Sequence, residues 1–294
     1  MSDQNRKYLN QQYCPINKEA QFFPAPAKLN LSLSIIGQRA DGYHLLESVF
    51  CFINLNDEVY LLPRIDTQIN LHSSTFAKRA EDDLTVKAAR LLQIEGKVQK
   101  GVDIWLNKRI PIGAGLGGGS SDAATVLLAL NKLWQINFSR EQLIQLSVRL
   151  GADVPFFVFG NNAFVEGIGE KLTKIHVPKK WYVIIYPNEL INTAKIFSHK
   201  DLTRNSTPSI MRTLQNADER KNDLQEVVLK EYPQVAKALN ALKPFGYPIM
   251  TGSGSCVFLE CDSSEEARKV FQAVSESFEA YCVNSLTEHP LLND

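Results

Sequence analysis

The chain has 294 residues, of which 44% are hydrophobic, enough to fill the cores of two domains of ordinary size. Lys plus Arg and Asp plus Glu number 32 each, so we expect neither nucleic acid nor a membrane surface as a partner. The five cysteines form no C-x-x-C pair, which predicts reduced thiols in a cytoplasmic protein and neither disulfides nor zinc.

The first half of the chain is expected to be a mixed α+β layer. Residues 1–20 are polar and lack the apolar segment of a signal peptide, so they are interpreted as an extension. Alternation over residues 28–35 predicts a half-buried strand with Lys28 and Asn30 on its polar face. The same criteria predict further strands at 48–53, 58–62, 68–72 and 102–106, and helices at 84–93, 120–134 and 139–150.

The second half begins after a break at residues 174–180, which contain a proline and several lysines. We therefore expect two domains, 1–175 and 176–294. The pattern beyond the break predicts strands at 181–186, 256–261 and 280–284 and helices at 208–216, 224–232, 235–242 and 264–277. Strands that alternate with helices in this way indicate a sheet with helices on one face.

The run PIGAGLGGGSSD, from Pro111 to Asp122, is typical of a phosphate-binding loop. Its five glycines let backbone N–H groups approach an anion, and the following helix directs its positive dipole end to the same place. Asp122 is interpreted as a first-turn residue that complements this dipole. The candidate nucleotide-binding residues are Pro111, Ile112, Gly113, Ala114, Gly115, Leu116, Gly117, Gly118, Gly119, Ser120 and Ser121.

Three other interpretations of this loop are weaker. It matches the dinucleotide motif G-x-G-x-x-G, but no acidic residue ends a strand about 20 positions later, as that motif requires. No Lys follows the last glycine, so it is not a Walker A loop. A flexible linker would not lead directly into the apolar helical pattern that begins at Ala123.

Several residues could serve a phosphoryl transfer, which needs a cradle, a cation and a group that takes or orients the proton of the attacking hydroxyl. Asp153 is the candidate base, on a turn between a helix and an apolar strand, and Pro155 is expected to keep Val154 extended. An ordinary Asx-turn is the alternative for Asp153, and a solvated strand-edge residue is the alternative for Lys28.

Other polar side chains have two interpretations each. Ser120 and Ser121 could bind Mg²⁺ or phosphate through oxygen, or cap the helix. Tyr43 and His44 follow a charged turn and could offer an aromatic face and a hydrogen-bonding ring to a substrate.

The order of these motifs resembles the GHMP small-molecule kinases. The resemblance covers about residues 23–283 and rests on PAKLNL from Pro26, RADGYH from Arg39, the glycine loop, GADVP from Gly151 and TGSGS from Thr251. It implies a ribosomal-S5-like first domain and a ferredoxin-like second domain. It also implies ATP and Mg²⁺ as cofactors. Within the family, the AKLNL strand and the DGYH element resemble those of kinases in the non-mevalonate route to isoprenoid precursors. This narrower resemblance implies phosphorylation of the 2-hydroxyl of a cytidine-diphosphate-linked methylerythritol.

The resemblance also assigns residues. Asp153 matches the catalytic aspartate of the family and Lys28 its catalytic lysine, which would hold Asp153 ionised. The residues that match substrate-binding positions are Asn30, Tyr43, His44, Thr193 and Phe197. The TGSGS loop is expected near the active cleft or, alternatively, as a tight turn before a strand.

One departure concerns the nucleotide. The family has Asn where this chain has Asp83, and a carboxylate can accept a hydrogen bond from the adenine amino group but cannot donate one. The alternatives to this function are a homoserine or mevalonate type of GHMP kinase, a nucleotide-binding protein without catalysis and a dinucleotide oxidoreductase. Either a monomer or a homodimer is compatible with the sequence.

Overall fold

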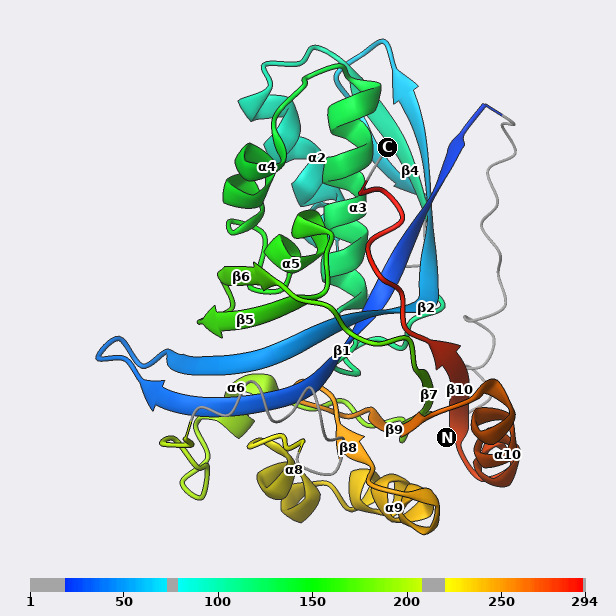
Figure 1. Ribbon diagram of the computed structural model, residues 1–294. Helices are drawn as coiled ribbons and strands as arrows, with labels where there is room; N and C mark the ends of the chain where they lie inside the picture. The colour runs from blue at the N-terminus through cyan, green and yellow to red at the C-terminus, as the bar shows by residue number, and fades with distance from the viewer. Residues whose placement is uncertain (1–18, 73–78, 208–219, 293–294) are drawn as a thin grey trace.

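The computed structural model describes residues 19–72, 79–207 and 220–292, in two domains that each contain a sheet. In Figure 1 the first domain lies above the second, and the long strands β1 and β2 run between them. The helix predicted at 208–216 lies outside the described residues. In the described part of the chain, no helix is both long and apolar enough to cross a membrane.

The first sheet is built on one long antiparallel hairpin, β1 (Gln21–Gln38) and β2 (His44–Arg64). The prediction of separate strands at 48–53 and 58–62 was wrong, because β2 is continuous through both. The polar residues between them coincide with a register shift between Pro26 and Ala27, where a bulge accommodates the extra residues of β2. The strand predicted at 28–35 is the middle of β1.

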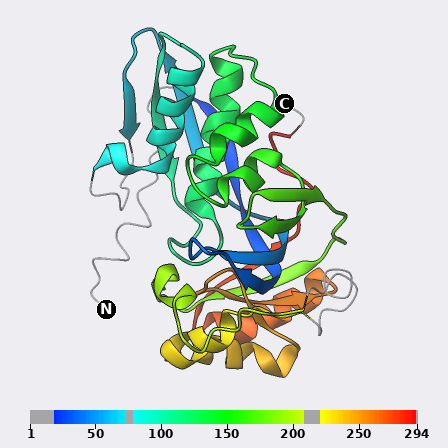
Figure 2. The ribbon, with the colours of Figure 1, turned by 90° about the vertical axis from the view of Figure 1, so that its left-hand side faces the viewer.

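Four shorter strands complete the sheet, in the order β3-β4-β2-β5-β6, with β1 paired to β2. They are β3 (Ile69–His72), β4 (Gly101–Asn107), β5 (Ala163–Gly167) and β6 (Lys171–Lys174), of which β5 and β6 were not predicted. Helices cover one face, as Figure 2 shows. They are η1 (Ala80–Asp82), α2 (Leu84–Glu95), α3 (Gly118–Leu133), α4 (Arg140–Ser147) and α5 (Val154–Phe159). Ser139 caps α4 as predicted, within a capping box.

Helix α5 replaces the apolar strand expected after Asp153. Proline suits the first turn of a helix, since its fixed φ is helical and its missing N–H would have no partner there, so Pro155 starts the helix and Val154 is helical instead of extended. Residues 154–158 are all buried, which removes the polar face that would have revealed a helix in the sequence. Gly160, with φ 79°, ends the helix.

The second sheet has the order β10-β7-β9-β8 and is antiparallel. The helices and strands of the second domain are β7 (Trp181–Tyr186), α6 (Thr193–Phe197), α8 (Gln225–Glu231), α9 (Pro233–Leu242), η3 (Lys243–Phe245), β8 (Ile249–Met250), β9 (Val257–Cys261), α10 (Ser264–Ser275) and β10 (Glu279–Asn284). Val183 and Ile185 of β7 pack in the cluster with α8, α9 and α10, whereas Tyr182 and Ile184 pack against the first domain. The prediction of helices on one face is confirmed.

The end of the chain returns to the first domain. The N–H of Leu286 donates to the carbonyl of Phe52 (2.8 Å), and the N–H of His289 donates to that of Gly160 (2.8 Å). Arg140 of α4 donates to the carbonyl of Leu292 (2.8 Å). This segment therefore holds the C-terminal end of α5, the helix that begins directly after Asp153.

Candidate active site

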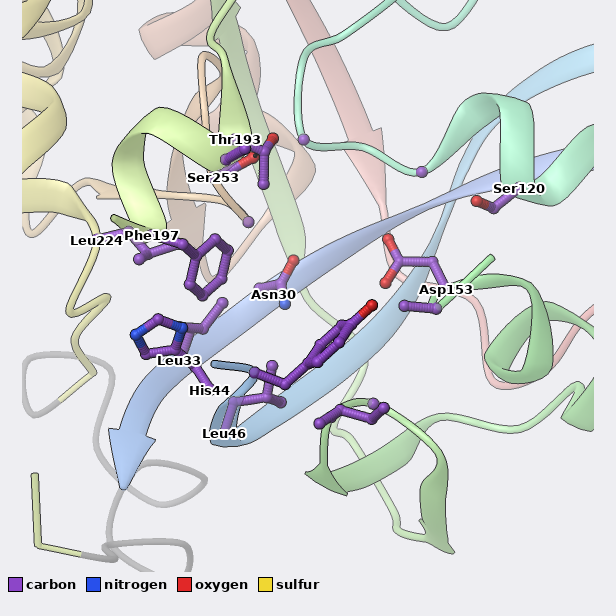
Figure 3. Close-up of a pocket in the computed structure, with 18 of the residues that line it drawn as sticks. Asn30, Leu33, His44, Leu46, Ser120, Asp153, Thr193, Phe197, Leu224 and Ser253 are labelled. Carbon is purple, nitrogen blue, oxygen red and sulfur yellow. Dashed lines mark hydrogen bonds between the residues drawn. The ribbon is translucent and has the colours of Figure 1, made fainter. Parts of the chain in front are cut away.

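A cavity of about 800 Å³ lies between the two domains. Figure 3 shows Asp153 and Ser120 at one end and His44 and Phe197 at the other, with Asn30 between them. The structure thus brings together residues from β1, the β1–β2 turn, the glycine loop, α5 and α6. The residues of the sequence prediction that line the cavity are Lys28, Asn30, Tyr43, His44, Gly115, Gly117, Ser120, Asp153, Thr193 and Phe197.

Lys28 is a buried cation on β1, with only 3% of its side chain exposed. Its ammonium group donates to Oδ1 of Asn30, lies 3.5 Å from Oδ2 of Asp153 and sits 4.4 Å from the centre of the Phe50 ring. Burial lowers the pKa of Lys28, and the charge of Asp153 counteracts this effect. The interpretation of Lys28 as a solvated edge residue was wrong.

Asp153 is more open than its partner. The side chain is 36% exposed and, in Figure 3, points into the cavity. It precedes α5, where no side-chain capping bond occupies its carboxylate. The Asx-turn alternative receives no support from that geometry. A carboxylate that lies beside a buried cation and is open to the cavity can face a bound hydroxyl.

Asn30 links the two domains beneath Lys28. Its backbone N–H donates to Oγ1 of Thr251 (2.9 Å), and its amide donates to Oγ of Ser48 (2.9 Å). Oγ1 of Thr251 also donates to Oδ1 of Asn30 (3.4 Å). The TGSGS loop therefore lies at the site. Its Thr251 helps to fix Oδ1 of Asn30, the oxygen that accepts the hydrogen bond from Lys28.

The glycine loop is held between both domains. The N–H of Lys28 donates to the carbonyl of Leu116 (3.0 Å), and that of Cys256 donates to the carbonyl of Ala114 (3.1 Å). Gly113, Gly115 and Gly117 have positive φ angles of 68°, 79° and 73°. This conformation exposes the loop to the cavity only at Gly115, Gly117 and Ser120.

The remaining loop residues have other places. Ala114 and Leu116 are buried in the interdomain core, and the Ser121 hydroxyl donates inward to the carbonyl of Pro26 (2.6 Å). Pro111, Ile112 and Gly113 precede the part that lines the cavity, and Gly118 and Gly119 form the first turn of α3. Of the two serines, only Ser120 faces the cavity.

Replacing Gly115 with Ala tests this loop conformation. A Cβ there would lie 2.4 Å from the carbonyl oxygen of Thr251, at a φ that disfavours side chains. We expect Gly115→Ala to lower the free energy of unfolding by at least about 2 kcal/mol, measured by urea denaturation. The control is Gly119→Ala, whose Cβ would meet only Leu84 at 3.8 Å. Equal stability of the two variants would contradict the tight packing of Gly115.

A buried charge cluster supports the loop from behind. Lys108 donates to Oδ2 of both Asp57 and Asp122, the latter at 2.6 Å, and Oδ1 of Asp57 accepts from the N–H groups of Arg109 (2.6 Å) and Ile110 (2.8 Å). Burial opposes the charge of Lys108, but the two carboxylates outweigh it and raise its pKa. Asp122 is therefore a member of this cluster. The prediction that it lies in the first turn of the helix was wrong, because α3 begins at Gly118 and its first turn holds no acidic residue.

Replacing Lys108 with Met would leave two buried carboxylates without their cation. We expect Lys108→Met to lower the free energy of unfolding by about 3 to 5 kcal/mol in urea denaturation at neutral pH. Burial raises the pKa of Asp122 in the folded protein, although Lys108 opposes this effect. The folded variant therefore takes up a proton on Asp122 at higher pH than the unfolded chain does, so its free energy of unfolding should increase as pH falls. Adding Asp122→Asn should restore part of the loss. No restoration would argue against charge as the cause.

The other end of the cavity is aromatic. The rings of His44 and Phe197 lie 5.2 Å apart, tilted by 42°, and Tyr43 is 62% exposed at the adjoining turn. Oγ1 of Thr193 and Oγ of Ser253 are 2.8 Å apart, which joins α6 to the TGSGS loop. A flat ring could be held here, with polar groups close by.

Asp83 caps helix α2. Its Oδ1 accepts from the N–H of Thr85 (2.8 Å) and from the Thr85 hydroxyl (2.5 Å). This oxygen is committed to the helix, and Asp83 does not line the cavity.

The sequence analysis missed several residues of this site. Phe50, Leu33 and Leu46 line the cavity from β1 and β2. Ser253 lines it from the TGSGS loop, which was expected near the active cleft although Ser253 was not singled out. In the sequence, the three apolar residues are indistinguishable from ordinary core positions. Arg204, which hydrogen bonds to His44, lies outside any helix or strand and had no local signal.

Comparison with known proteins agrees with this geometry. The model of the GHMP kinases N terminal domain matches residues 83–161, and that of the GHMP kinases C terminal domain matches residues 198–280. The fold and the site thus define a small-molecule kinase of the GHMP class, with the α+β architecture in two domains that the sequence predicted. Members of this class take their phosphoryl group from ATP.

A relative from Neisseria meningitidis serogroup C (strain 053442), the 4-diphosphocytidyl-2-C-methyl-D-erythritol kinase, is 55% identical over 93% of this chain and 97% of its own length. A crystal structure of 4-(cytidine 5'-diphospho)-2C-methyl-D-erythritol kinase superimposes with a TM-score of 0.79 at 31% identity, over 90% of this chain and 99% of that one. The chain belongs to the family of 4-diphosphocytidyl-2-C-methyl-D-erythritol kinases.

The mevalonate kinase of Methanococcus jannaschii is similar in fold alone, with a TM-score of 0.67 at 13% identity, over 92% of this chain and 99% of that one. The mevalonate type of kinase is therefore less favoured than the main interpretation.

Proposed function

We propose that the chain phosphorylates the 2-hydroxyl of 4-diphosphocytidyl-2-C-methyl-D-erythritol with ATP, giving the 2-phosphate and ADP in the non-mevalonate route to isoprenoid precursors. One observation carries the proposal: a single cavity has the Lys28–Asp153 pair and the glycine loop at one end and an aromatic pair at the other. The first end suits a phosphoryl transfer, and the second suits a pyrimidine base.

In this proposal Asp153 faces the acceptor hydroxyl. As the hydroxyl oxygen bonds to the γ-phosphorus and the bond to the β–γ bridging oxygen breaks, the hydroxyl proton passes to the Asp153 carboxylate. Lys28 places positive charge next to Asp153 and the reacting oxygens. Asn30 holds Lys28 in place. The residues that bind the substrate in this proposal are Asn30, Tyr43, His44, Thr193 and Phe197, with Tyr43, His44 and Phe197 at the cytidine.

The oxygen groups at the glycine-loop end of the cavity fit ATP with Mg²⁺. Mg²⁺ prefers oxygen ligands and usually binds through substrate phosphates with few protein ligands. Ser120 is the protein oxygen of the loop that faces the cavity and would hold the ion or a phosphate. Mg²⁺ would neutralise charge on the transferred group.

We further propose that the domains extend over 1–175 and 176–294, since the first sheet ends at Lys174 and the second begins at Trp181. A cytoplasmic location would supply ATP and keep thiols reduced, and Cys51, Cys256, Cys261 and Cys282 are free.

The deciding experiment measures ADP release from ATP and Mg²⁺ with the diphosphocytidyl methylerythritol substrate, beside homoserine and mevalonate. We expect turnover with the first compound alone. Turnover with another alcohol and none with the first would overturn the substrate and keep the kinase. NAD binding without any ADP release would overturn the kinase as well.

A further inference from the structure

Arg204 ties the two domains together at the aromatic end of the cavity. It lies in the segment after α6 and donates from all three nitrogens. Within its own domain it donates to three backbone carbonyls: Nη1 to Leu202 (3.1 Å), and Nη2 to Phe197 (3.1 Å) and His199 (2.9 Å). Its Nε donates to Nε2 of His44 in the first domain (3.1 Å).

The bond to His44 fixes the protonation of that ring. A guanidinium group has donors only, so Nε2 of His44 must accept and the hydrogen must sit on Nδ1. Partial burial lowers the pKa of His44, and the charge of Arg204 lowers it further, so the neutral ring is favoured. The ring also rests against Phe197, whose carbonyl the same guanidinium holds.

Nδ1 of His44 is left for a ligand. No described residue hydrogen bonds to it, and the ring lines the cavity. A free imidazole prefers its hydrogen on Nε2, so without Arg204 the ring would tend to present an acceptor at Nδ1 instead of a donor. Cytosine has hydrogen-bond acceptors at O2 and N3, and either could accept from Nδ1–H of His44.

We propose that Arg204 is a positioning residue for the substrate: it holds His44 as the neutral Nδ1–H form against Phe197, so that His44 donates to the base. The choice of cytosine as that base rests on the function proposed above. This role requires the planar guanidinium group of Arg204, because that group alone donates all four hydrogen bonds in fixed directions.

The first test needs no substrate. Nitrogen NMR of the full chain, with the ring of His44 assigned through His44→Gln, reports which nitrogen carries the hydrogen. We expect Nδ1–H in the wild type and a shift toward Nε2–H in Arg204→Ala. An Nε2–H ring in the wild type would overturn the proposal, whatever the substrate of the enzyme is.

The second test is kinetic. We expect Arg204→Ala to raise KM for the diphosphocytidyl substrate about tenfold or more, with kcat and the KM for ATP little changed. This pattern is expected because the variant loses a contact that binds the substrate equally before and during the transfer. Arg204→Lys keeps the charge without the fork and should show a similar rise. Recovery in Arg204→Lys, or unchanged KM in both variants, would overturn the proposal.

The matched control is Arg149→Ala, which removes an exposed ion pair with Glu95 (2.6 Å) on the first domain. It should leave KM and the His44 ring as in the wild type. If the wild type releases no ADP with this substrate, the proposed function fails, while the NMR comparison still decides the role of Arg204.

Discussion

Replacing Asp153 with Asn should lower kcat by about 10² or more, because an amide cannot accept the hydroxyl proton that the carboxylate takes or orients. The substitution keeps the size of the side chain at a partly exposed position, so folding should be retained. ATP binding should also persist, since the glycine loop is held by Lys28, Cys256 and the TGSGS loop, none of which needs the charge of Asp153. Steady-state ADP release and ATP titration measure the two effects separately.

The control for this variant is Asp66→Asn, which changes an exposed carboxylate paired with Arg64 (2.6 Å) at the far side of the first domain. It should turn over like the wild type. Near-normal turnover of Asp153→Asn would mean that Asp153 is dispensable for the transfer. A parallel loss of ATP binding would mean that its charge supports the loop instead of the acceptor.

The parts of this site that the sequence predicted are those with a local signal. Alternation placed Lys28 and Asn30 on one face of a strand, and consecutive glycines before an apolar run marked the loop and the start of α3. The detail within the loop had no such signal. Ser120 and Ser121 are adjacent on a helix and so point in directions about 100° apart, which puts one hydroxyl in the cavity and the other in the interior.

The rest depended on distant contacts. Helix α5 is buried all round, so its sequence shows neither a period of two nor one of 3.6, and Pro155 is compatible with both elements. The continuity of β2 is set by its pairing with β1 at a bulge. Arg204 acts on His44, 160 positions away, through a tertiary contact that no spacing rule describes.

Lys28→Met should have the second large effect, a loss of kcat of about 10² to 10³, as for removal of a group that stabilises charge in the transition state. Met has a similar length and can pack against Phe50, and Asn30 keeps its bonds with Thr251 and Ser48. Removing a cation that burial disfavours should cost little stability, so the variant should be folded but nearly inactive. Lys87→Met, on the exposed face of α2, is the control.

The pH dependence gives an independent test of the same pair. Because burial lowers the pKa of Lys28, the activity of the wild type should fall on the alkaline side below the ordinary range of a lysine, as Lys28 loses its proton. Asp153 counteracts this lowering, so in Asp153→Asn the alkaline limb of the residual kcat/KM should move to still lower pH. A limb that stays in place in Asp153→Asn would mean that the group that titrates is not Lys28. A limb that moves would show that the two residues, 3.5 Å apart in the cavity, act as a coupled pair.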